Sequence, residues 1–271
     1  MLSILNSISS LNAENALSTT QMNLQKVLTE LSTGLRINSG SDDAAGLSIA
    51  NGLQANISAL TQSSQNASDG VGLLQTADGA LSQVTTLLNR AITLATEASN
   101  GGLSTSQSTA LDTEYQSILT EIGTIGTTTN YNGTSVFGST ATVYTSDGTS
   151  GGSNTTSTTI SALTTAALSL TGSDLLNATD AQTALTEISS AISTIAANRG
   201  AIGASVNQLN AASNVENTEV TNLTSAENNI LNADIGQTVA QMTQYTVLQQ
   251  TGMEALSQSN QAQQSVLKLL Q

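Results

Sequence analysis

The sequence predicts a mainly α protein, in which both ends of the chain form a long antiparallel coiled-coil helix bundle and the middle supplies a small β-hairpin region. The main observation is a pair of matching apolar stripes. Fourteen positions from Leu53 to Ser99 follow alternating four- and three-residue spacing, and ten of them are apolar. Fifteen such positions from Ala181 to Ile230 include eleven apolar residues. A mean spacing of about 3.5 residues keeps one seam of a helix facing a partner helix along its whole length.

Composition supports a thin fold of this kind. The 271 residues include one Phe, four Tyr and no Trp, so few large side chains are available to fill a thick core. Aliphatic residues and Ala suffice for a helix seam, and the absence of Pro suits long unbroken helices. The positions expected to form this rod seam include Leu53, Ile57, Leu60, Leu74, Leu81, Ile188, Ile192, Ile202, Leu209 and Leu223.

Residues 1–38 and 235–271 are expected to form a separate pair of terminal helices. Their apolar stripes are displaced by one residue from the stripes of the rod, and the displacements fall within 39–46 and 231–234. We therefore expect short spoke linkers at these two places. A second stripe of mostly small residues on the last helix favours a face covered by neighbouring copies of the chain, although small residues also tolerate solvent. The positions expected to pack the terminal pair are Leu24, Leu28, Leu31, Val239, Met242, Met253 and Leu256.

The rod is expected to comprise residues 47–126 and 173–230. It includes a third, shorter helix at about 104–125, where apolar residues again follow helical spacing. Three helices could then share one core.

The segment 127–172 changes abruptly to Thr, Ser and Gly. Asn132–Gly133 and Asp147–Gly148 are turn signals beside short β-branched runs, so this segment is expected to be a small β region or a partly mobile surface loop. After it, Thr179 with Gln182 predicts a capping box at the start of the return helix.

The residue types that are missing exclude much familiar chemistry. Without His or Cys the chain lacks the commonest general base, thiol nucleophiles, disulfides and the usual zinc ligands. Five scattered basic residues in a chain of net charge -14 leave no basic patch, so neither nucleic acid nor an anionic membrane is an expected partner. Asp42 and Asp43 could be proposed as a paired acid and base, but adjacent side chains diverge, and a polar linker or helix cap is the expected role. No catalytic, cofactor-binding or metal site is predicted.

The sequence also lacks the features of a membrane span and of a cleavable signal peptide. No segment approaches eighteen consecutive apolar residues, and the first twenty residues have no basic stretch before an apolar block. We therefore expect no membrane span and no cleavable signal peptide.

Three segments together carry a family resemblance. They are residues 31–81, which begin LSTGLRINSGSDDAAGLSIANGLQ, YNGTSVF at 131–137, and residues 229–271, which begin NILNADIGQTVAQMTQYTVLQQTG. The sequence resembles the bacterial flagellins over roughly residues 1–137 and 180–271, whereas the Thr- and Ser-rich middle matches nothing specific. The resemblance implies a filament subunit with no enzymatic activity, whose terminal helices form an inner tube and whose rods form the surrounding shell.

The resemblance also implies partners and a location. These are identical subunits in a homopolymer, filament cap and hook-junction proteins, and an export chaperone at the C-terminal helix, residues 232–271. The flagellar filament is extracellular, and the family is exported unfolded through its own secretion channel. The related hook-filament junction proteins have similar ends and remain the alternative; the intact YNGTSVF segment favours a filament subunit.

Arg90, Leu94 and Glu114 match positions through which many flagellins are detected by the host innate receptor for flagellin. Arg90 and Leu94 lie one helical turn apart and miss the predicted core stripe, so we expect them on an exposed face. Packing of Leu94 against the next subunit of a filament would explain that face equally well.

Overall fold

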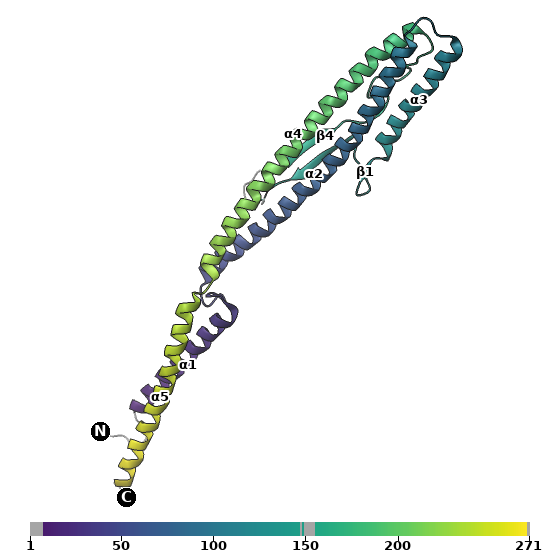
Figure 1. Cartoon of the computed structure of the whole chain (residues 1–271). Coiled ribbons are helices and arrows are strands. Elements are labelled where there is room, and N and C mark those ends of the chain that lie inside the picture. The colour runs from purple at the N-terminus through teal and green to yellow at the C-terminus, as the bar shows by residue number, and fades with distance from the viewer. Residues whose placement is uncertain (1–7, 147, 149–154, 270–271) are drawn as a thin grey trace. The chain divides into compact units, whose positions relative to one another are not determined.

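The structure, a computed structural model, describes residues 8–146, 148 and 155–269 (Figure 1). The described residues form five helices and four short strands. They fall into two compact units, one made from Met1–Ala55 with Asn222–Gln271 and the other from Asn56–Thr221.

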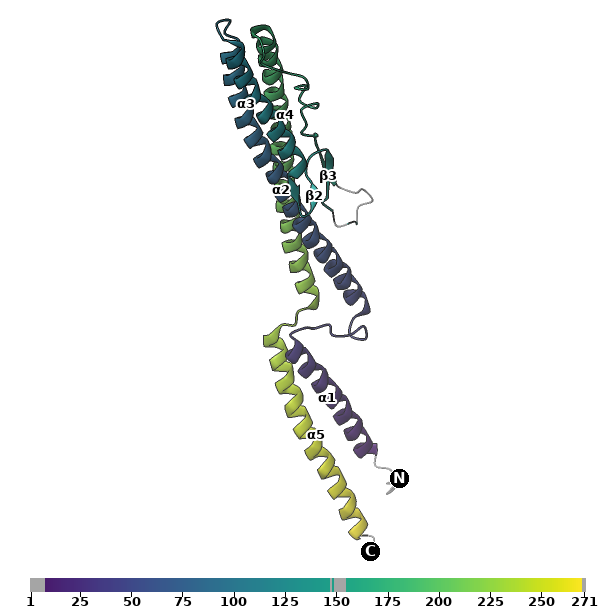
Figure 2. The same cartoon turned by 90° about the vertical axis from the view of Figure 1, so that its right-hand side faces the viewer.

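The first unit is built on α1 (Ile8–Thr33) and α5 (Ile235–Leu269), which lie side by side in both views (Figures 1 and 2). The Ser10 and Ser259 hydroxyls are 2.9 Å apart. The backbone of Leu35, just after α1, pairs with that of Asn232, just before α5, so the helices run antiparallel. Val27 of α1 and Thr238 of α5 are buried in this unit. A Cβ on Gly252 would lie 3.3 Å from Leu17, which shows how closely the helices approach.

Helix boundaries lie where the apolar stripes change register. α1 ends at Thr33, and Gly34 follows with φ +73° and an amide bonded to the Glu30 carbonyl, a typical helix C-terminus. Ten residues, 34–43, separate α1 from the next helix, α2 (Ala44–Ala98). Three residues, 232–234, separate α4 (Ala178–Leu231) from α5. The one-residue displacements at 39–46 and 231–234 therefore fall in or beside these interruptions.

Three helices share the core of the second unit. α2 and α4 run along each other, and α3 (Thr105–Thr128) covers a further face of α2 (Figure 2). Tyr115 and Ile122 of α3 are fully buried, and both belong to one apolar cluster with Leu88 of α2 and Ile188 of α4. The predicted mainly α fold with a third, shorter helix is confirmed.

Two small hairpins complete this unit. β1 (Asn130–Tyr131) pairs antiparallel with β2 (Thr134–Ser135) through Asn132 and Gly133, both at positive φ, as a tight hairpin turn requires. β3 (Ser139–Tyr144) pairs antiparallel with β4 (Thr155–Ile160), with Ser139 opposite Ile160. The predicted turn at Asn132–Gly133 is present, whereas Asp147 of the second predicted turn lies outside the described residues.

The segment 127–172 is more than a surface loop. Val136, Phe137, Ile160, Leu163, Leu168 and Leu170 are buried in the same apolar cluster as the helices. Of the two expectations for this segment, the small β region is confirmed. Its buried residues were not predicted because they are separated by Thr, Ser and Gly and form no helical stripe.

The helix starts are capped by polar side chains. The Asp43 carboxylate accepts a hydrogen bond from the Gly46 amide at the start of α2, which is the helix-cap role expected for this residue. Ser104 caps α3, and its amide donates to the Gln107 side chain. The predicted capping box at Thr179 and Gln182 is wrong, because Asn177 accepts from the amides of Thr179 and Asp180 and occupies the cap position two residues earlier.

Candidate assembly surfaces

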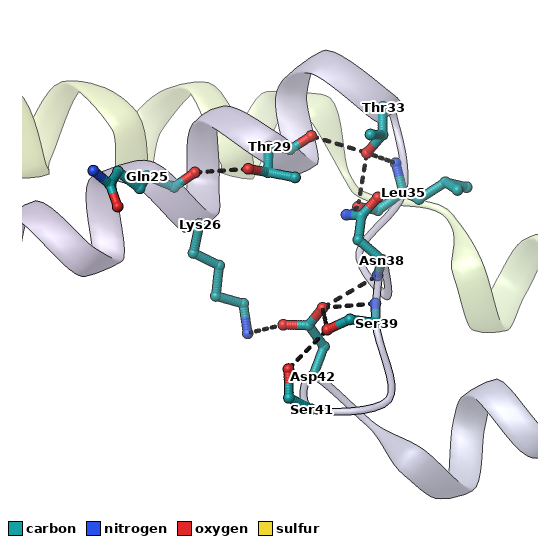
Figure 3. A network of polar contacts seen from close by, with 9 residues as sticks. All are labelled: Gln25, Lys26, Thr29, Thr33, Leu35, Asn38, Ser39, Ser41 and Asp42. Carbon is teal, nitrogen blue, oxygen red and sulfur yellow. Dashed lines mark hydrogen bonds and ion pairs between the residues drawn. The ribbon is translucent and has the colours of Figure 1, made fainter.

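The linker between α1 and α2 is held by one carboxylate (Figure 3). Asp42 accepts hydrogen bonds from the Asn38 amide at 3.2 Å and from the Ser39 amide and hydroxyl, each at 3.0 Å. Its other oxygen lies 3.2 Å from the Lys26 ammonium on α1. The Ser39 hydroxyl, followed by Lys26, lowers the pKa of Asp42 below its ordinary range. The linker is therefore tied back onto α1.

A second set of contacts ties this linker to the segment between α4 and α5. The Arg36 amide donates to the Leu231 carbonyl at 2.6 Å, and its guanidinium donates to the Ile230 carbonyl at 2.7 Å. The Ala233 amide donates to the Gly34 carbonyl at 3.0 Å. These backbone bonds hold the two linkers beside each other at one end of the α1–α5 pair.

The terminal helices leave apolar side chains uncovered. Of the predicted packing positions, Leu24, Leu31, Met242 and Leu256 are half-buried. Leu28, Val239 and Met253 are exposed, by 46%, 40% and 49%. They are exposed because α1 and α5 each bury one narrow stripe against the other, and these three residues flank it. Two helices alone cannot cover the apolar surface that they carry.

Other exposed residues of these helices were missed by sequence reasoning. Ile8, Leu11 and Met22 on α1 and Val247 on α5 are exposed large apolar side chains. They fall outside any stripe of regular spacing, so periodicity does not single them out. Leu248, exposed by 44%, belongs to the predicted second stripe of α5. A neighbouring chain could bury all of these residues, because exposed patches of this kind commonly mark interaction surfaces.

All the predicted rod-seam positions are buried or half-buried. Leu60, Leu74, Leu81, Ile188, Ile202 and Leu209 are buried, and Leu53, Ile57, Ile192 and Leu223 are half-buried. On α2 the phase of the most buried stripe differs from the expectation, because Ala77, Val84 and Ala91 are buried where 78, 85 and 92 were expected. The burial of a second face of α2 by α3 and the hairpin segment moves the most buried line by about one residue.

Leu94 corrects a prediction. It was expected on an exposed face, yet it is only 1% exposed and belongs to the apolar cluster of the three helices. The two-helix stripe misplaced it because α3 covers this side of α2. Arg90 is exposed, and its Nε and Nη2 each lie 2.7 Å from Oε1 of Glu114 on α3. This contact raises the pKa of Arg90 and lowers that of Glu114.

The described residues form neither a metal-binding cluster nor a membrane-spanning helix. Within the described residues, no group of three or more acidic side chains is placed to hold a metal ion. None of the described helices is long and apolar enough to span a bilayer.

Comparison with known proteins identifies the family. Residues 4–142 match the bacterial flagellin N-terminal helical region, and residues 185–270 match the bacterial flagellin C-terminal helical region. A flagellin of Halalkalibacterium halodurans is 34% identical over 249 residues, which cover 91% of each chain. A Serratia marcescens flagellin is 45% identical over 123 residues, which cover 45% of this chain and 35% of that protein.

A solved structure agrees. The crystal structure of Bacillus cereus flagellin superposes with a TM-score of 0.50 at 30% sequence identity, covering 56% of this chain and 88% of that chain. The chain therefore belongs to the bacterial flagellin family.

Proposed function

We propose that this chain polymerises through the uncovered apolar faces of its terminal helices. As a member of the flagellin family it is a structural subunit of the bacterial flagellar filament. The observation that supports the mode of assembly is the exposure of Leu28, Val239 and Met253 on a helix pair that has no other cover within its unit. Burying such side chains against a second copy is favourable, at about 1.5–3 kcal/mol for each one fully buried.

The parts of the chain then have separate roles. Residues 1–38 and 235–271 form the inner tube, and 39–46 with 231–234 form the spokes. Residues 47–126 and 173–230 form the rod. Residues 127–172 form the variable β-hairpin region, whose buried apolar residues pack on the rod and most of whose described polar residues are exposed. The hydrogen bonds between Arg36 and the end of α4, and the Lys26–Asp42 pair, support the view that the spokes hold a defined conformation.

The test is assembly of purified monomer onto filament seeds, observed by electron microscopy. Leu28→Glu and Met253→Glu each place a charge on an uncovered apolar face, and elongation should stop. Gln25→Glu adds the same charge to an exposed polar position of α1 and should still elongate. Normal elongation by both apolar-face variants would refute the proposed surfaces.

The function is carried by packing, and no catalytic role is proposed. The alternative, a hook-filament junction protein, has less support, since the relatives named above are flagellins. The abundance of the chain in sheared filaments separates the two: a filament subunit is the main component, whereas a junction protein is present in a few copies.

Transient partners follow from the same surfaces. An export chaperone would cover residues 232–271, where Ile235, Val247 and Leu248 are exposed before assembly. Filament cap and hook-junction proteins would contact subunits at the two filament ends. Export to the extracellular filament through the family's secretion channel needs no disulfide, in keeping with a chain that has no Cys.

Recognition by the host innate receptor for flagellin is a further proposal. Arg90 and Glu114 are exposed and paired, so together they present a polar feature that a receptor could contact. Leu94, being buried, would act only by keeping α2 and α3 in place. In cells that report receptor activation, wild-type monomer should signal and Arg90→Ala should signal less. No signal from wild type would refute recognition, and an unchanged signal from Arg90→Ala would refute the site.

A further inference from the structure

The seam between α2 and α4 contains matched polar positions. The fifteen-position stripe of α4 has four members that are not apolar, namely Arg199, Ser213, Glu216 and Glu227. Each of the four meets a polar side chain of α2. A seam that served only to bury apolar surface would have no need of such matching.

Three of these pairs lie in the second unit. The Arg199 guanidinium donates to both carboxylate oxygens of Asp78, from Nε at 2.7 Å and from Nη2 at 3.1 Å. The Ser64 and Ser213 hydroxyls lie 2.8 Å apart. The Ser63 hydroxyl donates to Oε1 of Glu216 at 2.6 Å, and both residues are buried, with exposures of 1% and 5%.

The fourth pair lies in the first unit. With its amide turned so that the nitrogen faces the carboxylate, Gln54 donates to Oε1 of Glu227 at 2.7 Å. Along the chain, the α2 partners descend in number from Asp78 to Gln54 as the α4 partners ascend from Arg199 to Glu227. The four pairs therefore follow one antiparallel order.

Polar residues of the α2 stripe that lack a counterpart are satisfied differently. The Thr85 hydroxyl donates to the Leu81 carbonyl at 2.8 Å, and the Ser99 hydroxyl donates to the Thr96 carbonyl at 2.7 Å. Each bond lies within its own helix, so neither side chain requires a partner across the seam.

We propose that these matched polar pairs set the register of the α2–α4 helix pair. A heptad seam of aliphatic residues can slide by seven residues and still meet apolar side chains. After such a slide Arg199 would face Val71 or Thr85, and Glu216 would face Asn56 or Gly70. Glu216 is 5% exposed, so the loss of its partner would be strongly unfavourable. The Asp78–Arg199 side chains are 37–40% exposed, so the loss of that pair opposes the slide more weakly.

The environment of Glu216 indicates that the Ser63–Glu216 pair fixes the alignment of the helices and does not increase stability. Its second carboxylate oxygen, Oε2, is buried and has no hydrogen-bond partner in the described part of the chain. A well-packed Leu at this position would avoid that cost. Buried polar groups of this type fix alignment in coiled coils at the expense of stability.

The register matters for assembly, and this consequence rests on the proposed function. A slide of seven residues moves one helix about 10 Å along the other, because each residue rises about 1.5 Å. Surfaces formed jointly by α2 and α4 would then no longer match those of a neighbouring subunit.

The absence of Cys allows a direct test by cross-linking of the full-length monomer. Ser64→Cys with Ser213→Cys reports the observed register through a short thiol cross-linker. Ile57→Cys or Val71→Cys, each with Ser213→Cys, reports the two slid registers. Each reporter is placed in three seams. These are the wild-type seam, an apolar seam (Ser63→Ala, Asp78→Leu, Arg199→Leu, Glu216→Leu, Glu227→Leu) and a swapped seam (Asp78→Arg with Arg199→Asp).

The wild-type and swapped seams should cross-link only through the 64–213 reporter. The apolar seam should retain its helicity and give about tenfold more slid cross-links, because nothing polar opposes the slide. Cross-linking of the apolar seam at 64–213 alone would overturn the proposal and assign the register to α3 and the hairpins. If the fivefold variant loses helicity, two smaller variants give the same two readings separately: Asp78→Leu with Arg199→Leu, and Ser63→Ala with Glu216→Leu, each combined with Glu227→Leu. Polymerisation is not needed for this readout, so it stands apart from the proposed function.

Discussion

At the scale of single residues, the partners of the polar seam side chains could not be predicted from the sequence. Arg199 and Glu216 are visible as interruptions of an apolar stripe, but a stripe does not say what faces it. Their partners, Asp78 and Ser63, follow only once the antiparallel register is known. Leu94 was misplaced for a similar reason, since a two-helix pattern does not reveal that a third helix covers that side.

The Asp78–Arg199 pair predicts a pH dependence. The hydrogen bond from Arg199 lowers the pKa of Asp78 in the folded chain. A carboxyl whose folded pKa is depressed stabilises the fold above its unfolded pKa, and this contribution is lost as the pH falls through the folded value. The melting-temperature difference between wild type and Asp78→Asn should therefore be largest at neutral pH and shrink toward about pH 3.

Thermal unfolding followed by circular dichroism measures this difference. Glu121→Gln removes an exposed carboxylate of α3 and controls for the change in net charge. A difference for Asp78→Asn that stays constant over the whole pH range would show that the ion pair contributes nothing.

Two glycines of α3 give a matched comparison. A Cβ on Gly126 would lie 1.9 Å from the Leu163 carbonyl oxygen, whereas a Cβ on Gly123 would meet nothing within 4 Å. Gly126→Ala should destabilise the second unit by about 1–3 kcal/mol through overpacking. Gly123→Ala should stabilise it by up to about 1 kcal/mol, since Ala favours helix. Urea unfolding gives both values, and equal effects would mean that the 161–175 segment does not pack on α3.

At the scale of elements, helices were easier to predict than strands. The seam of α4 follows from the sequence, because its regular spacing reflects burial against a single main partner, and none of its stripe positions is fully exposed. The burial of the leucines at 163, 168 and 170 could not be predicted from the sequence, because they lie in turns and have no regular spacing. The tight hairpin at Asn132–Gly133 was predictable because only residues tolerant of positive φ suit that turn.

A charge in either helical seam should abolish assembly. Leu209 is 1% exposed, and Leu209→Glu should cost about 3 kcal/mol or more and unfold part of the second unit. Leu256→Glu should leave that unit folded, because Leu256 lies in the α1–α5 pair, yet it should still prevent filament growth. Asn210→Glu introduces the same charge at an exposed position of α4 and serves as the control. Helicity by circular dichroism and filaments by electron microscopy separate these outcomes, and filaments from Leu256→Glu would contradict the role of α5.

At the scale of the whole molecule, the two units differ in how much of their own apolar surface they bury. The second unit buries a continuous apolar cluster drawn from three helices and the hairpin segment. The first unit exposes many of its large apolar residues, and its helix pair carries polar side chains such as Thr246 and Gln249 in its seam. A lone pair of this kind is marginal, so we expect the terminal helices to fold stably only when other subunits cover them.

Hydrogen exchange of monomer and filament, measured on the same purified chain, tests this expectation most directly. Amides of α1 and α5 should exchange rapidly in the monomer and become strongly protected in the filament, because assembly buries their apolar faces. Amides in the buried parts of α2, α3 and α4 should be protected in both states. Equal protection of α1 and α5 in monomer and filament would contradict assembly through these two helices.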